Sequence, residues 1–379
     1  MPTFCEHRRA HGVAYCPADC AALTTGVFER LRLGPGEVLP PAELGVLDVA
    51  ILDMNHGWPN VGHEGVFSAF QDAACAIAPA LVQAGLRVRA ISFDVRRSLR
   101  MPAPGDDRFE IFVGTGGPGH LDPRLNDGRD TRSQGVAEDP AWEAPLFRLF
   151  DAIVSRPDAA LLSVCHTFGL MCRWLGVADA VARGDEKGGK SEGVRENLLT
   201  DGARAHPLFA AFARQLPAGG RLKVLDSRLY DLIPRHDAGR SVTVVGTETL
   251  GIGGPPGEAM TMMEVARDAS SRMPRVFGVN HHPEIIDRAN LMGMLRRKLD
   301  RGEIDREWYD RRVGALAVQF PDEKDDPRLQ TTTDFTFLGP LRFHLTRTAR
   351  RRAESLGRPF PASENDVDRE LTAAGTSPA

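Results

Sequence analysis

Residues 159–171 have the sequence AALLSVCHTFGLM. The first six are apolar or small, which is typical of a buried strand, and the residues after Cys165 fit a helix. A cysteine between a strand and a helix lies on a sharp turn that exposes a nucleophile. The positive end of the following helix favours the thiolate form of such a side chain. We therefore predict a reactive thiol nucleophile, Cys165, at the carboxyl end of a strand.

A second apolar run, at 276–279, is followed by the sequence NHHPE. A thiol nucleophile needs a base to deprotonate it, and the base needs a third group to fix its tautomer and orientation. Side chains two residues apart in an extended chain point the same way, so His282 and Glu284 can lie on one side. We predict His282 as the base and Glu284 as the carboxylate that orients it. Three other histidines are alternative bases: His120, His166 and His281.

A third apolar run, at 111–113, leads into the turn GTGGPG at 114–119. Backbone amides without side chains can approach a ligand closely. Gly117 and Gly119, with the amide of His166, are therefore the predicted oxyanion or substrate-binding groups. All three motifs follow a strand, and ligands bind at the carboxyl ends of strands in open α/β sheets. We therefore expect the motifs to converge in space.

The rest of the chain alternates between strand-like and helix-like patterns. Apolar runs predict strands at 46–52 and 87–93, and helical spacing predicts helices near 21–33, 67–81, 142–153, 286–301, 304–320 and 341–356. This alternation predicts an α/β fold with an open, mostly parallel sheet and helices on both faces. A polar stretch at 122–139 is expected to be an insertion or a mobile loop.

Together these motifs resemble the class I glutamine amidotransferases, especially stand-alone domains similar to the glutaminase part of GMP synthase. The resemblance covers roughly residues 46–296 and implies a flavodoxin-like fold. It implies that Cys165, His282 and Glu284 form a catalytic triad and that the glycine turn forms an oxyanion hole. The implied activity is hydrolysis of glutamine, or of a related small amide, with release of ammonia through a thioester. No cofactor or metal is implied.

The nucleophile turn departs from the family pattern Gly-x-Cys-x-Gly-x-Gln, because Ser163, Thr167 and Gly169 stand at three of its positions. Thr167 is β-branched and is expected to crowd a strained turn. Gly169 is expected to leave open the space in which the family places a glutamine side chain that holds the substrate. If free glutamine is not the natural substrate, Thr167→Gly with Gly169→Gln is expected to raise kcat/KM for glutamine roughly tenfold.

Two other functional classes are compatible with the motifs. One is an acyltransferase resembling the homoserine acyltransferases, which share this sheet and a Cys-His-Glu site. The other is a binding module that keeps the scaffold without catalysis. The sequence shows no synthetase domain to consume ammonia, so an amidotransferase implies a separate synthetase as a partner.

The composition limits the remaining classes. The formal net charge of −4 gives no reason to expect binding to nucleic acid or to a membrane surface. No apolar run approaches the length of a membrane span and no signal peptide is evident, so a cytoplasmic protein is expected. The predicted organisation is an N-terminal extension (1–45), an amidotransferase-like domain (46–300), a C-terminal helical extension (301–358) and a disordered tail (359–379).

Two further patterns leave alternatives open. Five residues near the N-terminus are potential zinc ligands or reduced, unliganded side chains: Cys5, His7, His11, Cys16 and Cys20. Residues 184–191, GDEKGGKS, match the phosphate-loop pattern, which binds phosphate only between a buried strand and a helix. The preceding residues do not form a buried-strand pattern, and Gly193 would interrupt a helix. A solvated loop is therefore the favoured interpretation of that segment.

Overall fold

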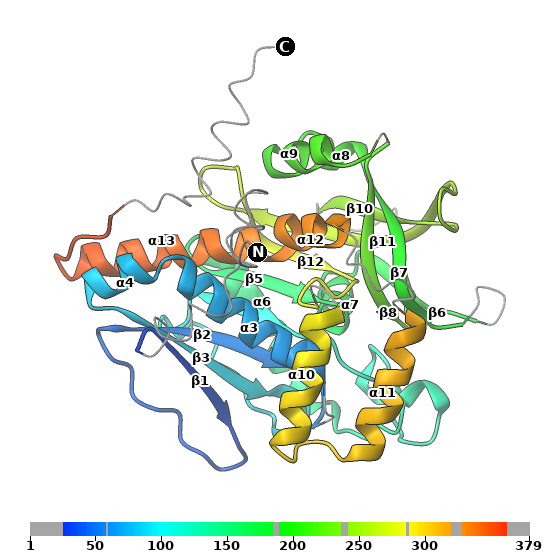
Figure 1. The fold of residues 1–379 in the computed structure, drawn as a ribbon, viewed down its shortest axis with the longest axis horizontal. Coiled ribbons are helices and arrows are strands. Elements are labelled where there is room, and N and C mark those ends of the chain that lie inside the picture. The colour runs from blue at the N-terminus through cyan, green and yellow to red at the C-terminus, as the bar shows by residue number, and fades with distance from the viewer. Residues whose placement is uncertain are drawn as a thin grey trace, which may run out of the picture.

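Ten strands form one open sheet in the order β1-β3-β2-β4-β5-β12-β11-β10-β7-β8 (Figure 1). The computed structural model describes residues 26–57, 60–184, 189–217, 219–235, 242–285, 288–319 and 327–361. The first six strands in this order pair in parallel. They are β1 (Phe28–Leu33), β3 (Arg87–Asp94), β2 (Val46–Asp53), β4 (Ile111–Gly114), β5 (Ala160–Val164) and β12 (Pro274–Val279).

The other half of the sheet is antiparallel. It continues from β12 through β11 (Pro256–Arg267), β10 (Thr243–Thr249), β7 (Ser191–Leu199) and β8 (Arg221–Arg228). A separate two-stranded ribbon consists of β6 (Ala178–Ala182) and β9 (Tyr230–Pro234). The sheet is therefore mostly parallel, since five of its nine strand pairings are, and the antiparallel strands extend one side of it.

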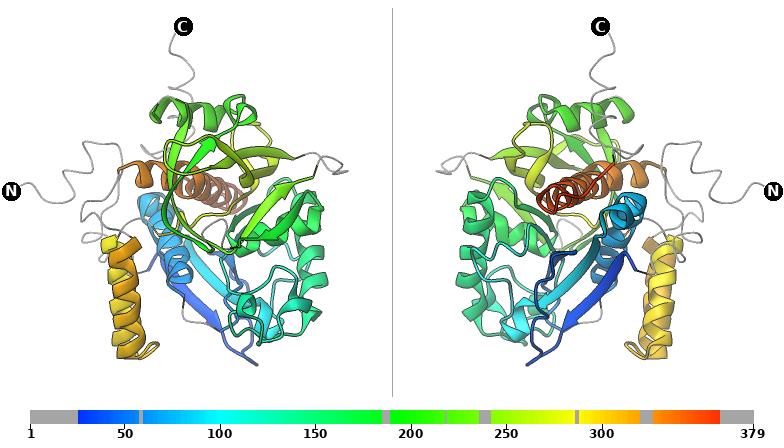
Figure 2. Two further views of the ribbon diagram at one scale, coloured as in Figure 1. Left: turned by 90° about the vertical axis from the view of Figure 1, so that its right-hand side faces the viewer. Right: turned by 90° about the vertical axis from the view of Figure 1, so that its left-hand side faces the viewer.

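Helices cover both faces of the sheet (Figure 2). One face carries α3 (Val61–Ala76), α4 (Ala78–Ala84) and α13 (Gly339–Ser355), and the other carries α6 (Glu143–Ser155) and α7 (His166–Leu175). The remaining helices are α5 (Val95–Ser98), α8 (Asp201–Arg204), α9 (Pro207–Gln215), α10 (Arg288–Asp300), α11 (Arg306–Gln319) and α12 (Pro327–Thr333), with a π-helical turn at Asp334–Leu338.

The central strands are buried on both sides. In β2, Val49 and Ile51 pack into the core beneath α3, α4 and α13, whereas Ala50 and Leu52 pack into the core beneath α6 and α7. Side chains alternate across a strand, so a strand covered on both faces has a continuous apolar sequence. The predicted fold class, an open and mostly parallel sheet with helices on both faces, is confirmed.

One expectation about local structure is wrong. The helix predicted near residues 21–33 is not present in its described part, because residues 28–33 form β1 and pair in parallel with β3 at the edge of the sheet. The sheet therefore begins before residue 46. The stretch 122–139, expected to be an insertion or a mobile loop, is held by short 3-10 turns at Pro123–Leu125 and Thr131–Ser133 and by a buried ion pair of Glu138.

Other predictions fall outside the described residues. The potential zinc ligands Cys5, His7, His11, Cys16 and Cys20 lie there, as does most of the predicted tail. Within the described ranges, no group of three or more His, Cys, Asp or Glu side chains is placed to hold a metal ion. No single helix in those ranges has the length and apolar character needed to cross a membrane, although the bent pair α3 and α4 meets the criterion by length and composition alone.

A buried carboxylate joins β1, α3 and α10. Glu64, on the first turn of α3, is 3% exposed and forms ion pairs with Arg30 at 2.5 Å and with Arg32. Lys298 of α10 lies 3.7 Å from the same carboxylate. Burial on its own would raise the pKa of Glu64, but Arg30 and Arg32 outweigh it and lower the pKa from 4.5 to about 2. The charged form of Glu64 therefore stabilises the fold.

We predict that Glu64→Gln lowers the free energy of unfolding at pH 7 by about 2–4 kcal/mol, because Arg30 and Arg32 lose the carboxylate with which they form ion pairs. Since the pKa of Glu64 is lower in the folded chain, this contribution is complete above pH 4.5 and disappears as the pH falls toward about 2. Urea denaturation of both proteins across that range measures it. Glu29→Gln, at a half-exposed carboxylate of β1, is the control and should change stability by less than about 0.5 kcal/mol. An equal loss from both substitutions would contradict the prediction.

Candidate active site

Cys165 lies on a strained turn between β5 and α7, as the sequence predicts. Its φ is +46° and its ψ −98°, a conformation that residues with side chains rarely adopt. Its amide donates a hydrogen bond to the carbonyl of Val279, at the end of the neighbouring strand β12, at 2.8 Å. This bond ties the turn to the segment that carries the histidines. Sγ lies 3.9 Å from the carbonyl oxygen of Ser227.

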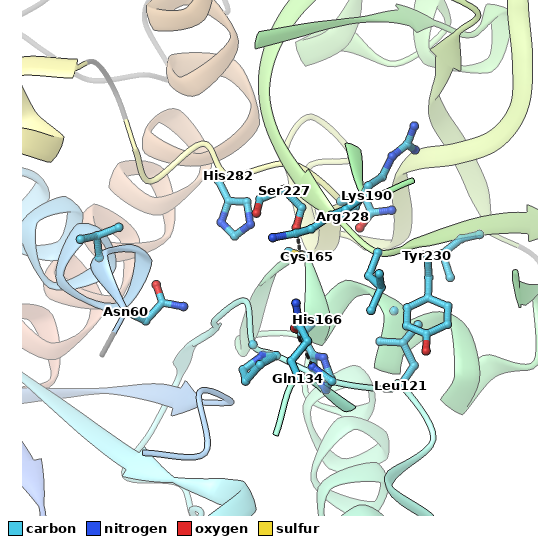
Figure 3. A pocket seen from close by; sticks show the side chains of 18 of the residues that line it. Asn60, Leu121, Gln134, Cys165, His166, Lys190, Ser227, Arg228, Tyr230 and His282 are labelled. Carbon is cyan, nitrogen blue, oxygen red and sulfur yellow. Dashed lines mark hydrogen bonds between the residues drawn. The ribbon is translucent and has the colours of Figure 1, made fainter. Parts of the chain in front are cut away.

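His282 lies between Cys165 and Glu284. Its Nδ1 is 2.8 Å from Oε1 of Glu284. Burial on its own would lower the pKa of His282, but the charge of Glu284 and then that of Cys165 raise the pKa well above its usual value. His282 is therefore favoured in the protonated form, and it lines the same cavity as Cys165 (Figure 3).

The three alternative bases have different surroundings. Burial, with Arg96 nearby, lowers the pKa of His166 well below its usual value. Burial and the charge of His282 lower the pKa of His281 to about 3, and its Nε2 is directed to Thr336. Both rings are neutral at physiological pH and have no carboxylate partner among the described residues. His120 is paired with the phenol of Tyr230 through Nδ1, and its Nε2 lies 3.6 Å from the exposed carboxylate of Asp130.

The glycine turn is held by a buried ion pair that the sequence analysis did not identify. Arg96 donates to the carbonyl oxygens of Met54 at 2.9 Å and Pro118 at 2.7 Å, and its guanidinium pairs with Glu138 at 2.7 Å. Both charged side chains are fully buried. Arg96 follows β3 by two residues and therefore lies at the carboxyl edge of the sheet. That position in the sequence could have identified Arg96 as a residue near the site. The pair fixes the backbone around Gly117.

The two predicted glycine donors differ in availability. Gly117 lines the cavity and packs so closely against the carbonyl of Met54 that a side chain would not fit. Gly119 also lines the cavity, but its amide donates to Oε1 of Gln134 at 3.0 Å. The amide of Gly119 therefore supports the loop. The amides of Gly117 and His166 remain the predicted oxyanion donors, and both residues line the same cavity as Cys165.

Glycines in α3 make room for Glu284. A Cβ on Gly62 would lie 2.5 Å from Oε1 of Glu284, and one on Gly65 would lie 2.5 Å from its carbonyl oxygen. The carboxylate therefore lies against the first turns of α3. Glu284 is 2% exposed; its Oε1 contacts the ring of His282, and its buried Oε2 has no hydrogen-bond partner among the described residues.

The expectation that Gly169 leaves open space is wrong. A Cβ at Gly169 would lie 2.5 Å from Cδ2 and 2.6 Å from Cδ1 of Leu121, so the side chain of Leu121 occupies that position. Thr167 packs closely against the sheet. It is fully buried against Gly114, and its hydroxyl donates to the carbonyl of Thr115 at 2.7 Å. Since a glutamine cannot enter at 169 without displacing Leu121, the expected gain from Thr167→Gly with Gly169→Gln loses its physical basis.

The cavity has a volume of about 390 Å³. Its lining brings together Gly117 and Gly119 with Cys165, His166 and His282, and the last three are labelled in Figure 3. Sequence reasoning missed the opposite wall, which α11 and the strands after the phosphate-loop pattern provide. Lining residues from these parts are Lys190, Arg228, Leu229, Tyr230, Leu232, Trp308, Arg311 and Arg312.

The phosphate-loop pattern does not have the structural context that phosphate binding needs. The strand before it, β6, is largely exposed, and Ser191 begins β7 instead of a helix. Residues 185–188 lie outside the described residues. Among the described residues that follow the pattern, a strand stands where a phosphate loop has the N-terminus of a helix.

Solved structures similar to this chain include the following two. One is a glutamine amidotransferase from Thermotoga maritima, with 16% sequence identity and a TM-score of 0.41, covering 79% of this chain and 98% of the other. Another is a proposed GMP synthase subunit from Thermoplasma acidophilum, with 11% identity and a TM-score of 0.35, covering 68% of this chain and 98% of the other. No family model and no curated protein matches the sequence. The chemistry of the site therefore has to be argued from its own geometry.

We predict that Gly169→Gln destabilises the protein. Replacing a helical glycine gains about 1 kcal/mol of helix propensity, but overpacking against Leu121 costs about 1–3 kcal/mol. Leu121→Ala should remove the clash, so the double variant should be more stable than the two single losses imply, by about 1–3 kcal/mol. A double-mutant cycle by chemical denaturation measures this coupling. Additive effects would mean that the two positions do not compete for space.

Proposed function

We propose that this protein is a cysteine-dependent amide-cleaving enzyme of the glutamine amidotransferase type. The observation that carries the proposal is the position of His282, with Cys165 on one side and Nδ1 2.8 Å from Glu284 on the other. A thiol, a base and a carboxylate that orients the base form the arrangement that nucleophilic acyl transfer needs. The substrate is glutamine or another amide.

In the first half of the reaction the Cys165 thiolate attacks the amide carbonyl carbon. A carbon–sulfur bond forms, and the carbonyl π electrons move to the oxygen. The amides of Gly117 and His166 stabilise that oxyanion, by about 3–4 kcal/mol for each donor. The oxyanion then collapses, the carbon–nitrogen bond breaks, and protonated His282 gives its proton to the departing nitrogen. Ammonia leaves and a thioester remains.

In the second half a water molecule attacks the thioester. Neutral His282 accepts a proton from that water, and Glu284 stabilises the resulting imidazolium. A second tetrahedral oxyanion forms in the same place, and its collapse breaks the carbon–sulfur bond. The carboxylic acid product leaves, and the thiolate beside protonated His282 is restored. An acceptor other than water would make the same site an acyltransferase. If the ammonia is used further, a separate synthetase would accept it.

We predict that Cys165→Ser abolishes turnover, by on the order of a thousandfold or more, because a hydroxyl at this position is a far weaker nucleophile. The free energy of unfolding should change by less than about 1 kcal/mol. Ammonia release from a panel of amides measures the activity. The intact mass of the protein after exposure to a glutamine-analogue electrophile measures the labelling. Cys75→Ser, at a half-buried cysteine of α3, is the matched control and should retain both. Near-normal activity of the Cys165 variant would refute the proposal.

We predict that His282→Asn lowers kcat/KM at least about a hundredfold, because general acid–base catalysis is lost. His281→Asn should retain activity within a few-fold, since His281 is neutral and directed to Thr336. Steady-state kinetics and melting temperatures of both variants test the pair. If both variants lose activity and stability to the same extent, the substitutions disturb the loop as a whole. The assignment of His282 as the catalytic base would then be unsupported.

A further inference from the structure

The wall of the cavity opposite the glycine turn comes from helix α11. Trp308, Arg311 and Arg312 all line the cavity, and their spacing of three and four residues places them on one face of the helix. The helix is fixed by an apolar cluster in which Leu316, Val313 and Trp308 pack with residues of α10, β7 and β8. Figure 1 shows α11 beside β7 and β8, at the antiparallel end of the sheet.

The lining of the cavity has a strong charge bias. Four of the described lining residues are Lys or Arg, and none is Asp or Glu. Lys190 and Arg228 lie together beside Ser227 in Figure 3. Arg228 is neutralised behind the wall by Asp226 at 3.1 Å and by Glu248, and Lys190 is paired with Glu192 at 2.5 Å. These two cations have counter-charges of their own.

Arg312 is different, because no carboxylate of the described residues forms an ion pair with its guanidinium, whereas Arg228 has two such partners. Burial lowers the pKa of the Arg312 guanidinium from its ordinary value, and the charge of Glu192 opposes this shift only in part. Arg312 lines the cavity, so an anion bound there would supply the counter-charge that the described residues do not. The adjacent Arg311 is exposed, and its carboxylate neighbour Glu307 is 3.9 Å away.

We propose that Arg312, with Arg311 beside it, is the anion-binding end of this cavity, and that the substrate is an amide carrying a carboxylate or phosphate group. The guanidinium fork matches the oxygens of either group, and a bidentate pair also fixes orientation. Trp308, Leu229 and Leu232 supply apolar contacts for the part of the substrate between the anion and the amide. A cavity of about 390 Å³ is in the range used for ligands of drug size, so it has room for such a linker. This inference rests on the proposed amide chemistry at Cys165 for the identity of the reacting group.

Binding can be measured separately from chemistry. The Cys165→Ser protein is titrated by calorimetry with N-acetylglycine, N-acetyl-β-alanine and N-acetyl-4-aminobutyrate, with their methyl esters, and with N-acetyl-aminoethyl phosphate. At the best length we expect the anion to bind at least about tenfold more tightly than the neutral ester. The compound that binds more tightly, carboxylate or phosphate, then identifies the anionic group of the substrate.

Variants assign that preference to Arg312. In the Cys165→Ser background, Arg312→Gln should reduce the ratio of anion to ester affinity to about one while the ester affinity stays unchanged, which shows that the cavity is intact. Arg312→Lys should recover part of the ratio. Arg306→Gln is the matched control, because Arg306 lies on the same helix against Tyr309 and does not line the cavity. Equal affinities for anion and ester in the parent, or a ratio that survives Arg312→Gln, would overturn the inference.

A reactive series separates this inference from the proposed function. Bromoacetyl versions of the same compounds are given to the protein with Cys165 intact, and peptide mass spectrometry follows modification of Cys165 relative to Cys75. Faster modification of Cys165 by the anionic probes supports both proposals. If Cys165 reacts no faster than Cys75 but the anions still bind through Arg312, the proposed function fails and the anion site stands. If Cys165 reacts rapidly but equally with anions and esters, only the anion site fails.

Discussion

The close approach of α7 to the centre of the sheet is the constraint on which the rest of the site depends. Strands β4, β5 and β12 lie side by side, with Ser163 paired to Gly114 on one side and to Gly278 on the other. Thr167 packs where a side chain at Gly114 would be, and Phe168 packs 2.6 Å from where a Cβ at Gly278 would be. Only glycines leave this room. The first turn of α7 is therefore pressed onto the sheet, and Cys165 is forced into its left-handed turn beside the ends of β4 and β12.

Electrostatics then decides among the histidines that this geometry gathers. His166 and His281 are buried and have no carboxylate partner in the described ranges, so each remains neutral. His282 is buried too, but Glu284 lies 2.8 Å from its ring and reverses the effect of burial on its pKa. Glu284 can lie there because α3 presents Gly62 and Gly65 to it. The choice of base therefore depends on two glycines more than two hundred residues away in the sequence.

The sequence predicted the structure correctly where the local pattern of apolar residues matches the way the segment packs in the fold. The buried strands β2, β4, β5 and β12 are continuous apolar runs because helices cover both of their faces, and each predicted motif follows one of them. The prediction failed at residues 28–33, where an edge strand with one partner has an ambiguous pattern. It also failed at Gly169, because the residue that fills its space, Leu121, is 48 positions away and has no sequence relation to it. The cations of α11 were not identified as cavity residues, since nothing local indicates that this helix is packed against β7.

The two halves of the sheet therefore have separate tasks under these proposals. The parallel half ends in the nucleophile, the base and the oxyanion donors, and each of these is fixed by backbone contacts that tolerate little change. The antiparallel half and α11 line the rest of the cavity with side chains from outside the triad. Because those side chains can change without disturbing the strained turn, the same chemistry can be directed to different amides. Occupation of the space at Gly169 by Leu121 is consistent with this division, since it removes a polar position next to the nucleophile and leaves recognition to the opposite wall. Substrate choice in this protein is then a property of α11 and its neighbours, and catalysis is a property of the junction at Cys165.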